Sequence, residues 1–185
     1  MVDGWSGVVL TGGRSERMGR DKALLPIGDE PMATRVVRAL KEAGATEVTC
    51  VGGDITALRA LGHAAIDDDT RDAGPLGGVL TGLAWASEQI TVVTPCDLLV
   101  PSAGPFRALV AALVGSDALA AVPVVDGRWR PLPAALRAAA RPALSQAFAE
   151  GERAVHRAME RLDLLVVDVG GLPDADTPED IRDHR

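Results

Sequence analysis

Short apolar runs rich in valine and isoleucine alternate with longer helical stretches along this chain of 185 residues. The runs predicted to be strands cover residues 7–11, 48–51, 64–66, 90–94, 119–125 and 164–169. The stretches predicted to be helices cover residues 32–43, 76–87 and 106–114, and two segments within 143–162 that are broken near Gly151. Strands separated by helices of this length predict an α/β fold with a mostly parallel sheet and helices on both faces. We expect one domain over residues 1–185.

Polar or glycine-rich segments follow three of the predicted strands directly. A glycine-rich loop follows the first strand, Asp67, Asp68 and Asp69 follow the third, and Asp97 follows the fourth. In open parallel sheets, ligands bind outside the carboxyl ends of the strands. The sequence therefore predicts that these three segments contribute to one site.

The glycine-rich loop, residues 10–22, has the sequence LTGGRSERMGRDK. Its adjacent glycines allow backbone N–H groups to approach a ligand closely. Four cations, Arg14, Arg17, Arg20 and Lys22, follow within nine residues. The loop matches neither the P-loop pattern nor the G-x-G-x-x-G pattern of dinucleotide-binding proteins. An ordinary turn with solvated arginines is the alternative, but the combination favours a phosphate-binding loop.

Asp97 ends the most apolar predicted strand. A carboxylate there can cap the following turn, or it can supply a hard oxygen ligand to Mg²⁺. Because the strand ends opposite a basic glycine-rich loop, we favour the metal site. No histidine is paired with Ser15, so we expect direct displacement rather than a covalent enzyme intermediate.

Charge and composition exclude several classes of protein. The formal net charge of −7 disfavours nucleic acid as a partner. No run approaches the roughly 20 apolar residues of a membrane span, and residues 1–5 lack the basic start of a signal peptide. Cys50 and Cys96 fit no metal-binding spacing and are expected to be buried, reduced thiols. These features predict a cytoplasmic protein with no membrane contact.

The loop resembles the signature of the nucleotidyltransferase superfamily, which opens with Leu-Ala-Gly/Ala-Gly and continues with Arg-Met-Gly and a lysine. The chain is most similar to the MobA-like group, the molybdenum cofactor guanylyltransferases. The similarity extends over most of the chain through the segments Gly74–Gly78, Pro95–Asp97, Arg130–Pro133 and Thr177–Asp180. It implies a Rossmann-like three-layer nucleotidyltransferase fold with a mostly parallel central sheet, related to glycosyltransferase A.

The resemblance also implies roles for individual residues. The nucleotide-binding candidates are Leu10, Thr11, Gly12, Gly13, Lys22, Asp68 and Gly77. The catalytic candidates are Lys22, Asp97 and Arg17. By the same resemblance a Gly-Gly pair accompanies guanine enzymes, which favours GTP. Thr11 stands where the family usually has alanine, and we expect the loop to tolerate it. Packing against the first strand is an alternative role for Gly77 and its neighbour Gly78.

The acidic candidates divide into three sets. Asp97 is the expected ligand of Mg²⁺, with Mn²⁺ as the alternative ion. Asp68 is expected to contact the nucleoside, although Asp67 lies one position away and a solvated acidic turn is an equal alternative. Near the C-terminus, Asp174 and Asp176 replace the family's Asn-x-Asn, and Asp176 is a second candidate metal ligand. Thr177 is instead expected to cap the last helix.

The expected reaction is transfer of GMP from GTP to molybdopterin, a phosphorylated small molecule, with release of pyrophosphate. Molybdoenzymes or other proteins of cofactor biosynthesis are the implied protein partners. Two alternatives stay open: a cytidylyltransferase or another transferase acting on a sugar phosphate or phospholactate, and a non-catalytic nucleotide-binding protein. Acceptor contacts are expected from the second half of the chain, around Arg128, Trp129 and Arg130 and the Gly151–Arg153 turn.

Overall fold

The computed structural model describes residues 4–12, 21–69 and 74–170. Its strands are β1 (Ser6–Leu10), β2 (Pro26–Ile27), β3 (Glu30–Pro31), β4 (Glu47–Val51), β5 (Ala64–Ile66), β6 (Ile90–Pro95), β7 (Ala120–Val125), β8 (Arg128–Trp129), β9 (Ala134–Arg137) and β10 (Leu164–Asp168). Its α-helices are α1 (Met32–Ala43), α2 (Ile55–Ala60), α3 (Gly74–Trp85), α4 (Ala103–Val114), α5 (Arg141–Ala149) and α6 (Val155–Met159). The described residues also include the 3₁₀ turns η2 (Lys22–Leu24) and η3 (Ala138–Ala140).

The central sheet has the strand order β10-β7-β9-β6-β1-β4-β5, and β8 pairs with β7 outside this path. Strands β5, β4, β1 and β6 form a parallel series. Strand β9 is antiparallel to both β6 and β7, so β7 runs in the same direction as β6, and β10 is parallel to β7. The prediction of a mostly parallel sheet is confirmed.

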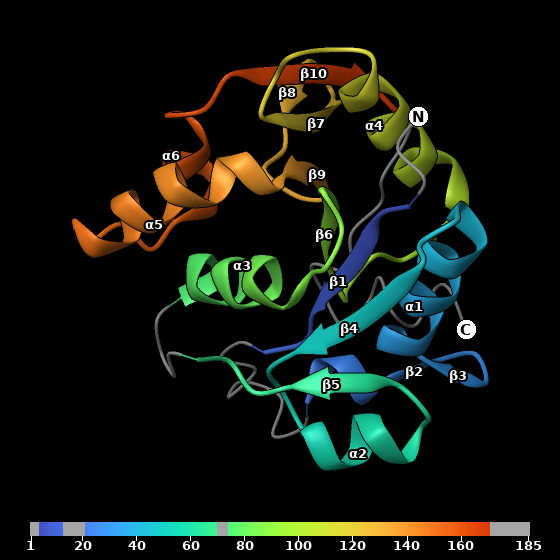
Figure 1. Cartoon of the computed structure of the whole chain (residues 1–185). Helices are drawn as coiled ribbons and strands as arrows, with labels where there is room; N and C mark the ends of the chain where they lie inside the picture. The colour runs from blue at the N-terminus through green and yellow to red at the C-terminus, as the bar shows by residue number, and fades with distance from the viewer. Residues whose placement is uncertain (1–3, 13–20, 70–73, 171–185) are drawn as a thin grey trace.

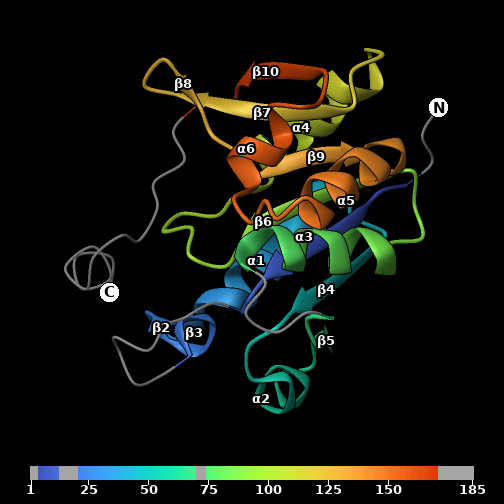
Figure 2. The same ribbon diagram turned by 90° about the vertical axis from the view of Figure 1, so that its left-hand side faces the viewer.

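Helices cover both faces of this sheet. Helices α3, α5 and α6 lie on one side of the sheet, and α1 and α4 lie on the other (Figure 1). Turned by 90°, the molecule shows α3, α5 and α6 in front of the strands (Figure 2). Two separate hydrophobic clusters correspond to the two sides. The arrangement is the predicted three-layer α/β fold.

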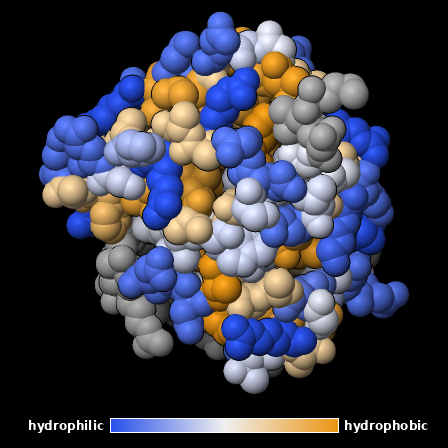
Figure 3. All heavy atoms as spheres, viewed as in Figure 1, coloured by the Kyte–Doolittle hydropathy of each residue, from blue (hydrophilic) through white to orange (hydrophobic). Residues whose placement is uncertain are grey.

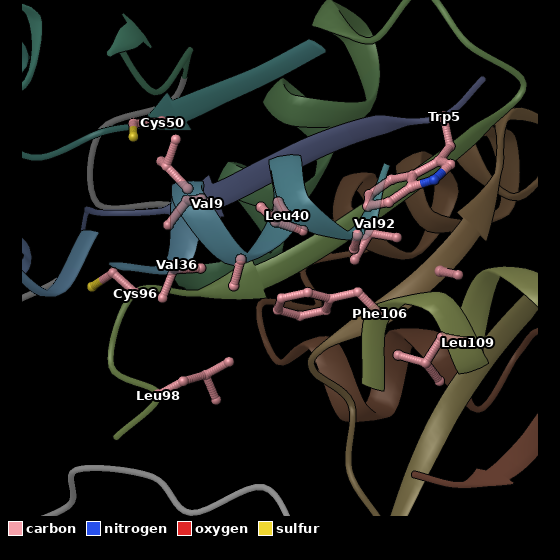
Figure 4. Packing of buried hydrophobic residues seen from close by; sticks show 14 of the residues in the cluster. Trp5, Val9, Val36, Leu40, Cys50, Val92, Cys96, Leu98, Phe106 and Leu109 are labelled. Atoms are coloured by element: carbon pink, nitrogen blue, oxygen red, sulfur yellow. The ribbon is translucent and has the colours of Figure 1, made fainter. Parts of the chain in front are cut away.

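Small and aliphatic side chains build the core on the side of α1 and α4. Phe106 and Leu109 of α4 pack with Val36 and Leu40 of α1 and with strand residues such as Val92 (Figure 4). Only 3% of the residues are aromatic. Because few large side chains are available to fill the core, the helices and strands must pack closely together. On the other side, a Cβ at Gly82 of α3 would lie 2.5 Å from Val8 Cγ1, which shows how closely α3 rests on β1.

Hydrophilic and apolar side chains are interspersed on the face shown in Figure 3. Among the described residues, the large exposed apolar side chains are far apart in the sequence: Leu61, Val100, Val114 and Val166. Isolated exposed apolar residues of this kind are normal for a folded protein. Within the described ranges, no helix is long and apolar enough to cross a membrane.

Several elements differ from the sequence-based predictions. Helix α2 and strand β9 were not predicted, and neither was the β2–β3 hairpin. Strand β9 is rich in alanine, and it is extended because it pairs with β6 on one side and β7 on the other. The Arg137 guanidinium at its end donates to the carbonyl oxygens of Leu113 (2.8 Å) and Ser116 (2.7 Å) at the end of α4. Pairing with its two neighbours therefore makes this segment a strand although its own sequence has only a weak preference for strand.

Candidate active site

The carboxyl ends of four parallel strands lie in register at one edge of the sheet. Leu10 of β1 is paired with Val51 of β4 and with Pro95 of β6, and Val51 is paired with Ile66 of β5. The segments that follow these strands therefore start side by side. This confirms that the glycine-rich loop, the three aspartates and Asp97 follow strands that end together.

Lys22 and Asp97 form an ion pair at this edge. Lys22 Nζ lies 2.8 Å from Asp97 Oδ2, and the two side chains are 25% and 29% exposed. The Cys96 N–H donates to the carbonyl oxygen of Leu10 (3.2 Å), which attaches the segment before Asp97 to the end of β1. The two leading catalytic candidates thus meet although 75 positions separate them in the sequence.

Asp21 holds Lys22 in place. One carboxylate oxygen accepts from the Ala23 N–H at 3.0 Å and caps η2, and the other accepts from the Asp54 N–H at 2.7 Å. The same carboxylate therefore fixes the start of η2 and ties it to the loop after β4. Asp21 was not among the predicted site residues, although an aspartate directly before Lys22 is a residue type that often caps a helical turn.

The loops after β1 and β4 are in direct contact. The Thr11 hydroxyl lies 2.7 Å from the Gly52 carbonyl oxygen and 3.1 Å from that of Val51, so it bonds to the protein's own backbone. A Cβ at Gly52 would lie only 2.9 Å from Gly12 Cα. A second glycine pair, Gly52 and Gly53, therefore lets the first loop approach, and both have φ of +77°.

Asp68 lies beside the end of β1 and the start of α3. Asp68 Oδ1 accepts from the Thr81 hydroxyl at 3.2 Å. A Cβ at Gly78 would lie 3.2 Å from Leu10 Cδ2 and 3.6 Å from Asp68 Oδ2, so Gly78 packs next to the first strand. Gly77 instead lines a hollow of about 120 Å³ between α3 and α5. Nucleotide contact by Asp68 and Gly77 stays a prediction.

Asp97 offers one carboxylate, which suits a metal ion whose other ligands come from a bound nucleotide and water. Among the described residues, no group of three or more histidine, cysteine or acidic side chains could hold a metal by itself. Mg²⁺ commonly uses one or two carboxylates together with phosphate oxygens and water, and Asp97 supplies one partly exposed carboxylate. The residues therefore fit Mg²⁺ bound jointly with a nucleotide. Gly13, Arg17 and Asp176 lie outside the described residues.

The segments predicted to bind an acceptor gather around α6. The Trp129 ring of β8 stacks on His156, with 4.1 Å between the ring centroids. In the Gly151–Arg153 turn, the Arg153 guanidinium lies over the Phe148 ring, and the Arg153 carbonyl accepts from the Leu76 N–H. The Ala154 N–H, a hydrogen bond from Arg157 and the Arg153 N–H lower the pKa of Glu152 to about 2. Glu152 therefore stays ionised and holds this turn in shape.

We expect Cys50 and Cys96 to resist thiol reagents while the protein is folded. Burial raises the pKa of each thiol to about 12, and for Cys96 the Asp97 carboxylate adds to the effect. At pH 8 very little reactive thiolate then forms. Ellman's reagent should label neither thiol before denaturation and both afterwards, while an Ala60→Cys variant should be labelled at once on exposed α2. Rapid labelling of native wild-type protein would contradict the burial of these thiols.

The mostly parallel three-layer fold, with Lys22 and Asp97 meeting at the carboxyl ends of its strands, is the arrangement that the resemblance to nucleotidyltransferases led us to expect. The model of the MobA-like NTP transferase domain matches residues 7–165. The chain belongs to this family.

Relatives agree with this assignment, and a solved structure shares the fold. A molybdenum cofactor guanylyltransferase of Pseudomonas putida (strain KT2440) is 33% identical over 156 residues, which cover 83% of this chain and 81% of that protein. Another, from Xanthomonas euvesicatoria, is 42% identical over 108 residues, which cover 58% of this chain and about half (54%) of that protein. Molybdopterin-guanine dinucleotide biosynthesis protein A from Archaeoglobus fulgidus shares the fold with a TM-score of 0.77 and 19% identity, over 97% of this chain and 96% of that one.

Proposed function

We propose that this nucleotidyltransferase is a guanylyltransferase that transfers GMP from GTP to molybdopterin, with Mg²⁺ as cofactor and pyrophosphate as the second product. The observation that carries the proposal is the Lys22–Asp97 pair at the carboxyl edge of the sheet. It supports a site for a polyphosphate and a cation together. The names of the Pseudomonas and Xanthomonas relatives support guanine and the molybdenum cofactor as the substrates.

In the proposed reaction, an oxygen of the acceptor phosphate forms a bond to the α-phosphorus of GTP, the bond between the α-phosphorus and the bridging oxygen breaks, and pyrophosphate leaves. Lys22 neutralises phosphate charge with its compact ammonium group. Asp97 would hold Mg²⁺, which when bound offsets the charge that builds on the phosphate oxygens. The backbone around Gly12 holds the nucleotide, and its contact with Gly52 keeps the loop in place.

Calorimetry with GTP, CTP, ATP and UTP, each with and without Mg²⁺, tests the proposal. We expect GTP to bind at least about tenfold more tightly than the others, and Mg²⁺ to strengthen its binding about tenfold. A Lys22→Met variant should lose most of this affinity. Lys41→Met removes the same charge from the exposed side of α1 and should bind as the wild type does.

Each other outcome identifies an alternative. Tighter binding of CTP would keep the mechanism and replace GTP by CTP as the donor. Nucleotide binding without pyrophosphate release in the presence of molybdopterin would favour a non-catalytic nucleotide-binding protein or a different phosphorylated acceptor. Failure to bind any nucleotide would contradict the proposal.

The proposal includes a cytoplasmic location and a small-molecule acceptor rather than nucleic acid or membrane. Both cysteines are free and buried, which suits a reducing compartment. The net charge of −7 disfavours nucleic acid. Molybdoenzymes and other proteins of cofactor biosynthesis are the partners to test in binding experiments with purified components.

A further inference from the structure

Asp68 occupies a position from which its carboxylate can meet a nucleoside. It follows β5 and lies close to Gly52 and Gly78: a Cβ at Gly52 would be 4.0 Å from Asp68 Cβ, and one at Gly78 would be 3.6 Å from Asp68 Oδ2. The same Cβ would also lie near Leu10 of β1 and Val51 of β4. The carboxylate is therefore next to the end of β1, where the proposed nucleotide loop begins.

Thr81 of α3 contacts this carboxylate through its buried hydroxyl group. The Thr81 hydroxyl donates to Asp68 Oδ1 at 3.2 Å and accepts from the Asp69 N–H at 3.2 Å. The Thr81 residue is only 5% exposed, so water competes little with these two bonds. One hydroxyl thus contacts both the Asp68 carboxylate and the backbone of the next residue.

We infer that Thr81 is a positioning residue for nucleoside recognition, acting through Asp68; this inference rests on the proposed function. An ionised carboxylate accepts two N–H or O–H groups in one plane, which suits the donors of a guanine edge or a ribose. Such paired hydrogen bonds require a fixed carboxylate plane. Thr81 supplies that constraint from α3, a helix that rests closely on β1 through Gly78 and Gly82.

The test measures the dissociation constant of Mg²⁺–GTP for Thr81→Val and Thr81→Ser by calorimetry. Valine keeps the shape of the side chain and removes the hydroxyl, so binding should weaken about fivefold to tenfold, the effect of one lost hydrogen bond. Serine keeps the hydroxyl and should restore binding to within about twofold. Thr49→Val makes the same chemical change at a buried threonine of β4 and should leave GTP binding unchanged.

A double-mutant cycle with Asp68→Ala separates positioning from a general structural effect. Asp68→Ala alone should weaken GTP binding, and adding Thr81→Val to it should change the constant by less than about twofold. An equal loss from Thr81→Val in both backgrounds would overturn the inference, because Thr81 would then act independently of Asp68. Unchanged binding by Asp68→Ala would also overturn it while leaving the proposed transferase intact. Absence of GTP binding by the wild type would instead contradict the proposed function itself.

Discussion

Replacing Asp97 by asparagine should reduce pyrophosphate release by about 10³-fold, while the protein stays folded. Asparagine keeps the size of the side chain but loses the negative charge that would hold Mg²⁺ against the phosphates. Loss of one preorganised electrostatic contact at a transferring phosphate commonly costs about 10²–10³-fold in rate. The measurement is pyrophosphate release at saturating GTP and Mg²⁺ in the presence of molybdopterin.

Stability should change little in this variant, which makes the kinetic result interpretable. The Lys22–Asp97 pair is partly exposed, and pairs of this kind contribute about 0–1 kcal/mol to the free energy of unfolding. Asp163→Asn makes the same change at an exposed position before β10 and should keep wild-type activity. Wild-type pyrophosphate release by Asp97→Asn would remove Asp97 from the proposed metal site and leave Lys22 to be tested alone.

Much of the fold could be predicted because local patterns and tertiary structure agree. Helix α1 covers residues 32–43 as predicted, and it ends at Gly44, whose φ of +108° is in the left-handed region that glycine favours. Strands β5 and β6 also begin at the predicted residues. Helix α2 was not predicted. Its signals in the sequence are weak: Asp54 caps it by accepting from the Ala57 N–H, and Leu58 is its buried residue.

The elements that could not be predicted depend on partners far along the chain. Strand β9 begins with Ala134 and Ala135, which have a weak preference for strand, and it is extended by its pairing with β6 and β7. No local pattern carries that information. For the same reason, the contact between the loops after β1 and β4 could not be predicted from the sequence.

The candidate site was predictable in outline and not in its contacts. The rule that ligands bind beyond the carboxyl ends of parallel strands correctly predicted that Leu10 and Asp97 would lie at one edge. The rule does not predict which side chains touch. The bond from Thr81 to Asp68 and the double role of Asp21 depend on the distances between loops, which only the assembled sheet determines.

Replacing Gly53 by alanine should lower the free energy of unfolding by about 3 kcal/mol. Gly53 has φ of +77°, a conformation that costs an alanine about 1 kcal/mol or more. Its new Cβ would lie 2.7 Å from Asp21 Oδ2 and 2.8 Å from the Thr11 carbonyl oxygen. Relief of this contact requires Asp21 to release the Asp54 N–H, and a hydrogen bond to a charged group contributes about 1.5–3 kcal/mol. Urea unfolding followed by circular dichroism gives the value.

Gly28→Ala is the matched control, because Gly28 has a similar φ of +62° and an added Cβ there meets no atom within 4 Å. It should cost only about 1 kcal/mol, the backbone contribution alone. The difference between the two variants then measures the close approach of the loops after β1 and β4. Because Asp21 also caps the turn that carries Lys22, Gly53→Ala should weaken GTP binding as well, and Gly28→Ala should not. Equal losses of stability would mean that the two loops move apart freely, so their contact could not hold the phosphate-binding loop in place.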